Sequence, residues 1–466
     1  MDTLEDPILR AFAATAARRP LAPLVASPSR SWSAADLDGA AAALAGRLAA
    51  EGFGEGDAIG LAAAPGAAFA AGYLALRRRR AVPVLCDSAR PTPDRLAALD
   101  RLGVVGFLAA ADGWPASARA WDLDRRAPAR QLAADPAWGA IKLTSGSTGE
   151  PRGIAVGAEA LAADDAQLAA AMGLAAADRI LALVPLSHSY GFASLLLPAL
   201  VRGSLLVVAE DRSPLAPLAA ARALEATVFP TVPAWLGAWV RLASAPAWPA
   251  SLRLVISAGA PLPPETARAF RLRCALPVHV FYGASESGGI TYDAEGGAAE
   301  RGTVGTVVPG VEIALDPDAG RLEVRSPAVA DTYLPEAAPE LAGGRFRTAD
   351  LARLEGGEVR LLGRADDLAI VRGKNVNPRE VEAVLRALPG VDDAFVLGVD
   401  GPDGPRSLLR AVVAARAGGV DYPRVVAWCR ERLAEHKVPR GVVVVTELPR
   451  TERGKLDRAA LAVLAG

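Results

Sequence analysis

Ten residues in the first third of the chain combine hydroxyl groups, glycines and one cation. They are Thr144, Ser145, Gly146, Ser147, Thr148, Gly149, Glu150, Pro151, Arg152 and Gly153. Glycines free backbone N–H groups to form an anion-binding nest, and hydroxyls can donate to phosphoryl oxygens. The segment is not a Walker A loop, because Glu150 rather than lysine follows Gly149. We therefore predict a loop that binds phosphate, with a flexible polar turn as the alternative.

Lysine is rare in this chain. Of its 51 lysine and arginine residues only four are lysines: Lys142, Lys374, Lys437 and Lys455. A position that keeps lysine is a candidate for chemistry that needs a compact ammonium group on a flexible stem. Lys455 follows a glycine in "LPRTERGKLDR" near the C-terminus, whereas Lys142 has no evident role.

Four further segments bring together groups that could do chemistry. "VPLSHSYGF" places His188 in a polar turn beside aromatic residues, and "FYGASESGG" separates Tyr282 from Glu286 by four positions. "FRTADL" contains Asp350, and "GRADD" contains Arg364 and Asp366. Each segment alone is a weak signal, so the elements that position them matter.

The first 363 residues are predicted to form a large α/β domain with mixed sheets and helices. Short β-rich runs such as "LLVVA" and "LRLVIS" alternate with alanine-rich stretches such as "ETARAFRLRCA", a pattern typical of α/β layers. "ARLEGGEVRLLG" is predicted to be a hairpin that turns at Gly356-Gly357.

A small α+β domain is predicted for residues 367–466, after a boundary at 364–366. Asn377 can cap a helix with Pro378 at its first position and Glu380 at its third. "DAFVLGV", "LLRAVVAAR" and "GVVVV" are predicted strands, and a second helix is expected over about 423–434.

Length and composition limit the class of protein. At 466 residues the chain is too long for one core. The net charge of −1 gives no reason to expect a nucleic-acid partner. Three scattered cysteines and an acidic N-terminus without an apolar signal segment favour a cytoplasmic protein with reduced core thiols.

One uncharged segment, residues 58–76, imitates a membrane span. Pro65-Gly66 divides it, so we expect a short strand and a helix instead of a span. The arginines that follow, residues 77–80, are interpreted as a solvated helix end, favoured by the helix dipole.

Taken together, the chain resembles the adenylate-forming superfamily of acyl-CoA synthetases, peptide-synthetase adenylation domains and luciferases. Six of that family's motifs occur in order: the Ser/Thr/Gly loop, PxxHxxG, YGxxE, a TGD-like segment, GRxDD and PxTxxGKxxR. The resemblance implies that a carboxylate attacks ATP to form an acyl-adenylate, and that a thiol then displaces AMP. It also implies that the small C-terminal domain is a mobile lid.

The resemblance implies a role for each nucleotide-site residue. The loop from Thr144 to Gly149 would hold the phosphates of ATP, with Arg152 where the family more often has lysine. Glu286 would ligate Mg²⁺, consistent with the oxygen preference of that ion. The nucleotide itself would be bound by Gly259, Ala260, Tyr282, Gly283, Asp350 and Arg364.

The remaining roles concern the reaction and the domain movement. Lys455 would stabilise negative charge that develops during adenylation, and His188 would lie near the acid and gate the thiol tunnel. Asp366 is the expected hinge, at which a change in backbone angles would swing the lid, and Gly373 would line the tunnel. The family pattern is broken at Ala349, in place of glycine, and at Asn375, where many members have arginine.

The acid is expected to be fatty or aryl. Members that activate amino acids place an aspartate just after PxxHxxG, but this chain has Ala193 and no acid nearby. An apolar pocket is predicted, with candidate residues Tyr190, Phe192, Leu195, Phe229, Val232 and Ala284. Coenzyme A is the expected thiol. An acyl carrier protein is the alternative, and a catalytically silent relative is a further one.

Overall fold

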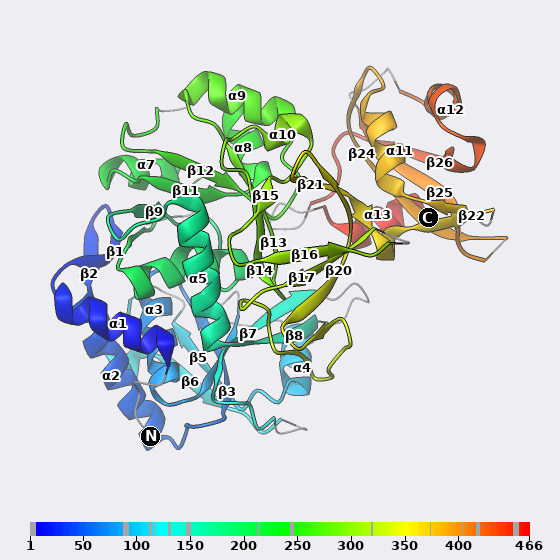
Figure 1. Ribbon diagram of the computed structural model, residues 1–466. Coiled ribbons are helices and arrows are strands. Elements are labelled where there is room, and N and C mark those ends of the chain that lie inside the picture. Colours follow the sequence, from blue (N-terminus) through cyan, green and yellow to red (C-terminus); the bar gives the residue numbers. More distant parts are fainter. Residues whose placement is uncertain are drawn as a thin grey trace. The chain divides into compact units, whose positions relative to one another are not determined.

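The computed structural model describes residues 6–86, 93–110, 114–115, 117–128, 132–145, 151–211, 213, 215–242, 247–317, 320–372, 374–402, 404–415, 420–450 and 456–466 (Figure 1). The chain forms two compact units. The first comprises residues 1–313 and 323–347, and the second comprises residues 314–322 and 348–466.

The larger sheet of the first unit is mostly parallel. Its strand order, in the described part of the chain, is β15-β14-β13-β12-β11-β9-β10-β1-β2. The strands are β1 (Pro23–Ser27), β2 (Arg30–Ser33), β9 (Arg179–Leu181), β10 (Leu205–Val207), β11 (Val228–Thr231), β12 (Leu254–Ser257), β13 (His279–Ala284), β14 (Gly288–Tyr292) and β15 (Thr306–Val307). The run from β1 to β13 is parallel, and β2, β14 and β15 are antiparallel additions at its ends.

A second sheet of the same unit contains the strands that precede and follow the glycine-rich segment. Its order is β18-β8-β7-β4-β3-β5-β6. The strands are β3 (Ala58–Ala63), β4 (Val82–Leu85), β5 (Gly106–Ala110), β6 (Asp122–Arg125), β7 (Trp138–Ser145), β8 (Pro151–Gly157) and β18 (Thr332–Leu334). Strands β7 and β8 are antiparallel, with Thr144 opposite Arg152.

Helices cover both sheets of the first unit. They are α1 (Pro7–Arg18), α2 (Ala34–Ala50), α3 (Ala67–Arg78), α4 (Pro93–Arg101), α5 (Ala158–Met172), α6 (Ser189–Gly191), α7 (Ala216–Ala223), α8 (Pro233–Val240), α9 (Pro264–Cys274) and α10 (Ala298–Arg301), with the 3₁₀ turn η1 (Ala118–Ala120). Two π-helical segments, η2 (Phe192–Leu196) and η3 (Pro198–Arg202), follow α6. Helix α5 contacts β14 of one sheet and β7 and β8 of the other, and Figure 1 shows it where the two sheets meet.

The segment that imitates a membrane span is a strand and a helix, β3 and α3, as predicted. Among the described residues no helix combines the length and apolar character needed to cross a bilayer. The prediction of a solvated arginine end is wrong for Arg77, which is buried and forms an ion pair of 2.7 Å with Asp6. Its guanidinium also donates to the carbonyls of Trp138 and Pro136, because a buried charge needs partners on all its donors.

The division between the two units falls within a third sheet. Its strands are β16 (Glu312–Leu315), β17 (Arg321–Arg325), β19 (Leu341–Ala342), β20 (Arg345–Glu355) and β21 (Glu358–Arg364). Strands β20 and β21 form the predicted hairpin, with Gly356 and Gly357 at its turn in the left-handed region. The domain boundary and hinge expected at residues 364–366 stay a prediction.

The second unit is α+β, as expected. Its elements are η4 (Ala365–Asp367), β22 (Ala369–Val371), β23 (Lys374–Val376), α11 (Pro378–Arg386), β24 (Val391–Gly401), β25 (Gly404–Ala415), α12 (Tyr422–Arg432), η5 (Glu435–Lys437), β26 (Gly441–Val445) and α13 (Arg458–Ala465). Asn377 caps α11 as predicted, accepting from the N–H of Arg379.

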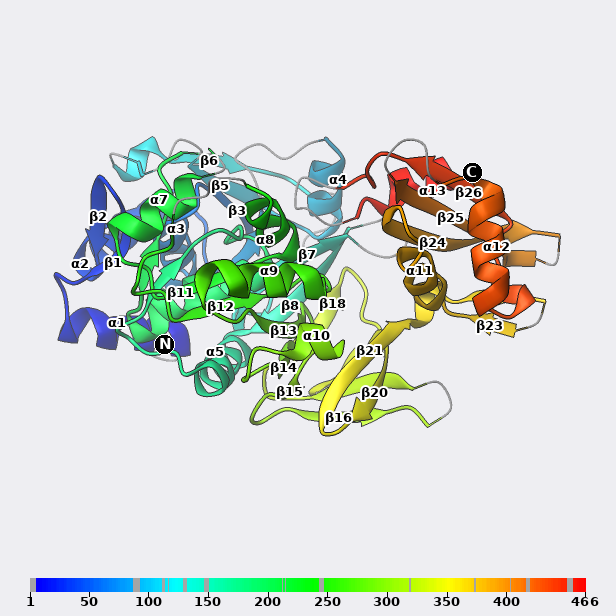
Figure 2. The ribbon, with the colours of Figure 1, turned by 90° about the horizontal axis from the view of Figure 1, so that it is seen from above.

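Alternate residues of the β24–β25–β26 sheet face two different helical layers. Ala394, Val396 and Val413 pack with α11 and α12, whereas Phe395 and Val412 pack with α13. Figure 2 shows α13 on the other side of this sheet from α11 and α12. The period-two alternation of strand side chains therefore builds two small cores from one sheet. All three cysteines are described and none forms a disulfide; Cys86 and Cys429 are buried as predicted, but Cys274 is partly exposed.

Candidate active site

Several candidate residues lie where parallel strands of the larger sheet end. Gly259 and Ala260 follow β12 and are exposed, and Gly259 has a positive φ of 84°. Tyr282, Gly283 and Ala284 are the last residues of the neighbouring strand β13. Open α/β sheets bind ligands at the carboxyl ends of their parallel strands, so these residues stand at an edge suited to a nucleotide.

The turn between β13 and β14 carries the candidate metal ligand, and it is tight. A side chain on Gly283 would place its Cβ only 2.6 Å from the carbonyl oxygen of Gly288. Only glycine allows the two strands to approach this closely. Ser285, Glu286 and Ser287 form the turn itself.

Glu286 is half-buried and held by contacts from distant parts of the first unit. The hydroxyl of Tyr333, on β18, donates to Glu286 Oε1 at 2.9 Å. The N–H of Ala330 donates to the Glu286 carbonyl at 2.7 Å. Burial and the charge of Glu286 raise the pKa of Tyr333, so the phenol stays protonated and remains a donor. The Arg152 guanidinium lies 5.7 Å from the centre of the Tyr333 ring, so Tyr333 contacts two of the candidate residues.

His188 caps α6 and is linked to the same turn through its neighbour. Its Nδ1 accepts the N–H of Tyr190 at 3.3 Å, so in the neutral ring the proton is on Nε2. The hydroxyl of Ser189 donates to that of Ser285 at 2.7 Å. The structure thus brings the PxxHxxG and YGxxE segments together.

Two of the aromatic candidates for the acid pocket are packed in the interior of the first unit. Phe192 is fully buried, with its ring 5.3 Å from that of Tyr73. Phe229 is also fully buried and packs between Trp235 and Trp248. Neither ring has accessible surface in this structure, so their pocket assignment stays a prediction.

Tyr190 lies near the ends of the parallel strands, and its hydroxyl is engaged in a hydrogen bond to one of them. Its hydroxyl donates to the carbonyl of Ile256 on β12 at 3.2 Å, and burial raises the pKa of the phenol. Its ring lies 5.9 Å from that of Phe281. The phenol is therefore tied to the sheet.

The second unit contains a group of three charged candidates. Asp350 on β20 is opposite Arg364 on β21, with Arg364 Nη1 3.5 Å from Asp350 Oδ1. The same guanidinium holds Asp366 more tightly, with Nε 2.9 Å and Nη2 2.7 Å from its two carboxylate oxygens. Burial alone would raise the pKa of Asp366, but the hydrogen bonds and charge of Arg364 outweigh it and lower the pKa below its ordinary value.

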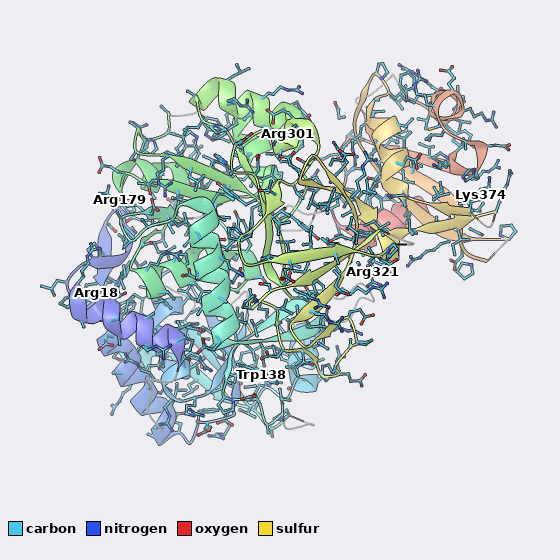
Figure 3. All side chains as sticks on the ribbon, viewed as in Figure 1. Arg18, Trp138, Arg179, Arg301, Arg321 and Lys374 are labelled. Atoms are coloured by element: carbon cyan, nitrogen blue, oxygen red, sulfur yellow. The ribbon has the colours of Figure 1, made fainter. Side chains whose placement is uncertain are left out.

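Several predicted residues cannot be placed. Residues 146–149, Gly373 and Lys455 lie outside the described residues, and so do the side chains of Thr144, Ser145 and Asn375. Lys374 is exposed at the start of β23 (Figure 3). Lys437 forms an ion pair of 2.7 Å with Glu380, which gives it a structural role.

Sequence reasoning missed Tyr333 and Asp164 beside the Glu286 turn, and it gave no role to Lys142, which lies beside the same turn. Tyr333 lies outside every motif, and nothing in its local sequence marks it. Lys142 is buried on β7, and Asp164 is buried on α5. Burial lowers the pKa of Lys142 and raises that of Asp164, while the opposite charge of each partner counteracts both shifts. The available signals were a lysine within an apolar strand and two adjacent acids within an alanine-rich helix.

The side chains around Glu286 are suited to a magnesium ion that binds together with a nucleotide. No group of three or more His, Cys, Asp or Glu side chains gathers among the described residues to hold a resident metal. Mg²⁺ commonly uses one or two carboxylates together with substrate phosphates. Glu286 matches that pattern, because Tyr333 fixes its carboxylate and the Tyr333 ring also lies beside the Arg152 guanidinium.

Comparison with known proteins identifies the class. Residues 12–334 match the family model described as AMP-binding enzyme, and residues 380–455 match that of the AMP-binding enzyme C-terminal domain. The chain belongs to this family and is an AMP-forming acid–thiol ligase of the acyl-CoA synthetase type, which confirms the resemblance and the fold class drawn from the sequence.

Individual relatives agree with this assignment. The chain is 31% identical to a feruloyl-CoA synthase of Amycolatopsis over 335 residues, which are 68% of this chain and 67% of that one. It is 31% identical to an isonitrile lipopeptide synthase of Streptomyces coeruleorubidus, over 98% of this chain and 33% of that protein. It is similar to the crystal structure of ATP-bound MatB from Rhodopseudomonas palustris, with a TM-score of 0.83, 25% identity, and coverage of 99% and 98% of the two chains.

Proposed function

We propose that the enzyme activates a fatty or aryl carboxylic acid and transfers it to coenzyme A. The carboxylate attacks the α-phosphorus of ATP, which releases pyrophosphate and leaves an acyl-adenylate. The thiol of coenzyme A then displaces AMP to give the thioester. The naming of one relative as a feruloyl-CoA synthase and of one structural neighbour as ATP-bound supports this reaction.

The observation that carries the choice of acid is the absence of an anchor for an ammonium group. Residues 185–200 include no acidic side chain, and Ala193 is buried in the π-helical segment η2. The Tyr190 hydroxyl already donates to Ile256. Because a buried ammonium needs a paired charge, this surrounding favours an apolar acid over an α-amino acid.

Each side chain has a proposed task in this reaction. Tyr333 orients Glu286, which would hold Mg²⁺ when ATP binds, and the ion would then supply positive charge to the phosphates. His188 lies by the acid, Lys455 stabilises the charge that develops during adenylation, and Gly373 lines the thiol tunnel. The phosphates and nucleoside are held by Thr144, Ser145, Gly146, Ser147, Thr148, Gly149, Arg152, Gly259, Ala260, Tyr282, Gly283, Asp350 and Arg364.

The C-terminal part, residues 367–466, is proposed to act as a lid that turns about residues 364–366. An acyl carrier protein is the second candidate acceptor, because one relative that aligns with nearly the whole chain is a lipopeptide synthase rather than a CoA ligase.

The test is acid-dependent pyrophosphate exchange across fatty, aryl and α-amino acids. Mass spectrometry then identifies the thioester formed with coenzyme A or with a carrier protein. We expect exchange with fatty or aryl acids and a coenzyme A thioester. Strong exchange with α-amino acids alone would overturn the proposed substrate class.

A further inference from the structure

Lys142 is a buried lysine in a chain that otherwise uses arginine almost everywhere. Its side chain, on β7, is 3% exposed. Its Nζ donates to the backbone carbonyl of Ser285, at 3.3 Å and 143 positions away in sequence. That carbonyl belongs to the residue immediately before Glu286. The ammonium therefore contacts the turn that carries the candidate magnesium ligand.

The other end of the turn is held by Asp164 of α5. Its Oδ1 accepts the N–H of Gly289 at 2.9 Å. The approach is so close that a Cβ on Gly288, whose φ is positive at 68°, would lie 2.4 Å from Asp164 Oδ1. Residues 285–289 are thus fixed at one end by a buried cation and at the other by a buried anion. With Tyr333 on the carboxylate itself, contacts from β7, α5 and β18 converge on this turn.

We propose that Lys142 is a positioning residue, whose ammonium holds the Ser285 carbonyl so that the Glu286 carboxylate is already placed to bind magnesium–ATP. This inference rests on the proposed role of Glu286. Residues just behind a metal ligand commonly change metal affinity by about 10- to 100-fold when they are altered. The alternative is that Lys142 only neutralises Asp164 and keeps the interior of the unit stable.

The central experiment replaces Lys142 by methionine, which keeps the length of the side chain and removes its charge. ATP binding is measured by calorimetry at increasing MgCl₂ and also in EDTA, beside the rate of pyrophosphate exchange. We expect the Mg²⁺ concentration for half-maximal ATP binding to rise about 10-fold. ATP affinity in EDTA should stay within about twofold of the wild type, and Lys142→Arg should recover part of the loss because it keeps the charge.

A matched control separates positioning from the general effect of removing a buried cation. Arg77→Met also removes a buried cation, but the partners of Arg77 are Asp6 and backbone carbonyls far from Glu286 in sequence. It should lower the thermal unfolding midpoint without changing the Mg²⁺ dependence. An equal change in Mg²⁺ dependence in Arg77→Met would overturn the proposal.

The double variant Lys142→Met/Asp164→Asn removes both charges and should fold better than the single variant. If Lys142 only neutralises Asp164, the double variant regains the wild-type Mg²⁺ dependence, and the positioning role is rejected. If neither variant folds, Lys142 is a core-stabilising residue and the proposal is likewise rejected. Glu286→Gln in the wild-type background tests the role of Glu286 separately, so failure of that role is distinguishable from failure of the role given to Lys142.

Discussion

Two carboxylates with proposed roles in the reaction are held in opposite ways. Glu286 and its turn are contacted by Lys142, Asp164, Ala330 and Tyr333, which come from well-separated parts of the first unit. The carboxylate of Asp366 is held by Arg364, two residues earlier in the same segment, and its backbone carbonyl accepts from Arg406. The first carboxylate depends on the tertiary structure, whereas the second depends on its own local sequence.

This difference matches what each residue is proposed to do. A metal ligand acts best when it is already in place, because no reorganisation is then needed at the moment of reaction. A hinge must change its backbone angles, and a partner two residues away can travel with it. Long-range contacts around Glu286 therefore favour rigidity, and the short-range ion pair of Asp366 permits rotation.

The largest effect is expected from blocking the hinge. Asp366→Pro fixes φ near −65°, so thioester formation from supplied acyl-adenylate should fall below detection while adenylation continues. Asp366→Ala is the control, because it removes the ion pair and leaves the backbone free. Equal loss of both half-reactions in a folded Asp366→Pro protein would contradict the hinge.

A smaller but still large effect is expected from Lys455→Ala. Acyl-adenylate formation, measured as pyrophosphate release, should slow by about 10²- to 10³-fold, the scale for losing one donor to a charged transition state. Thioester formation from supplied acyl-adenylate should stay near normal. Lys437→Ala, which breaks an ion pair with Glu380, serves as the matched lysine control and should leave adenylation unchanged.

Glu286→Gln tests the carboxylate that long-range contacts hold in place, as the proposed ligand of Mg²⁺. The amide keeps an oxygen that can accept from Tyr333 but loses the charge that Mg²⁺ prefers. We expect the half-maximal Mg²⁺ concentration for ATP binding to rise about 10- to 100-fold. Glu225→Gln, at an exposed ion pair with Arg179, is the control. An unchanged Mg²⁺ dependence in Glu286→Gln would assign the metal to another residue.

The smallest effect is expected from Asp366→Asn, measured as the free energy of unfolding in urea. The Arg364–Asp366 pair is about one-third exposed, so it should contribute no more than about 1 kcal/mol, and less at high salt. Because the folded-state pKa of Asp366 is lowered, its contribution is complete above the unfolded-state pKa of about 4. This stabilising contribution is lost as the pH falls through the folded-state pKa of Asp366. If the difference in unfolding free energy between the wild type and Asp366→Asn grew as the pH was lowered, the stabilising ion pair would be contradicted.

The local elements followed from the sequence because their causes are local. Pro65-Gly66 divides β3 from α3, Gly356-Gly357 forms the β20–β21 turn, and Asn377 caps α11. In each case the backbone preference of one or two residues decides the outcome. The ordered motifs likewise predicted the family, because six short segments in sequence order are far more specific than any one of them.

Burial and partners were decided only by the tertiary structure. The arginine run at the end of α3 gave no sign that Arg77 would be buried against Asp6 and three backbone carbonyls. Tyr333 and Asp164 reach the Glu286 turn from 47 and 125 positions away. By itself, the sequence determined the order of the elements, the family and the chemical groups of the site. Which buried charges support those groups depended on how β7, α5 and β18 pack, because pairing across such separations arises from packing and not from local preference.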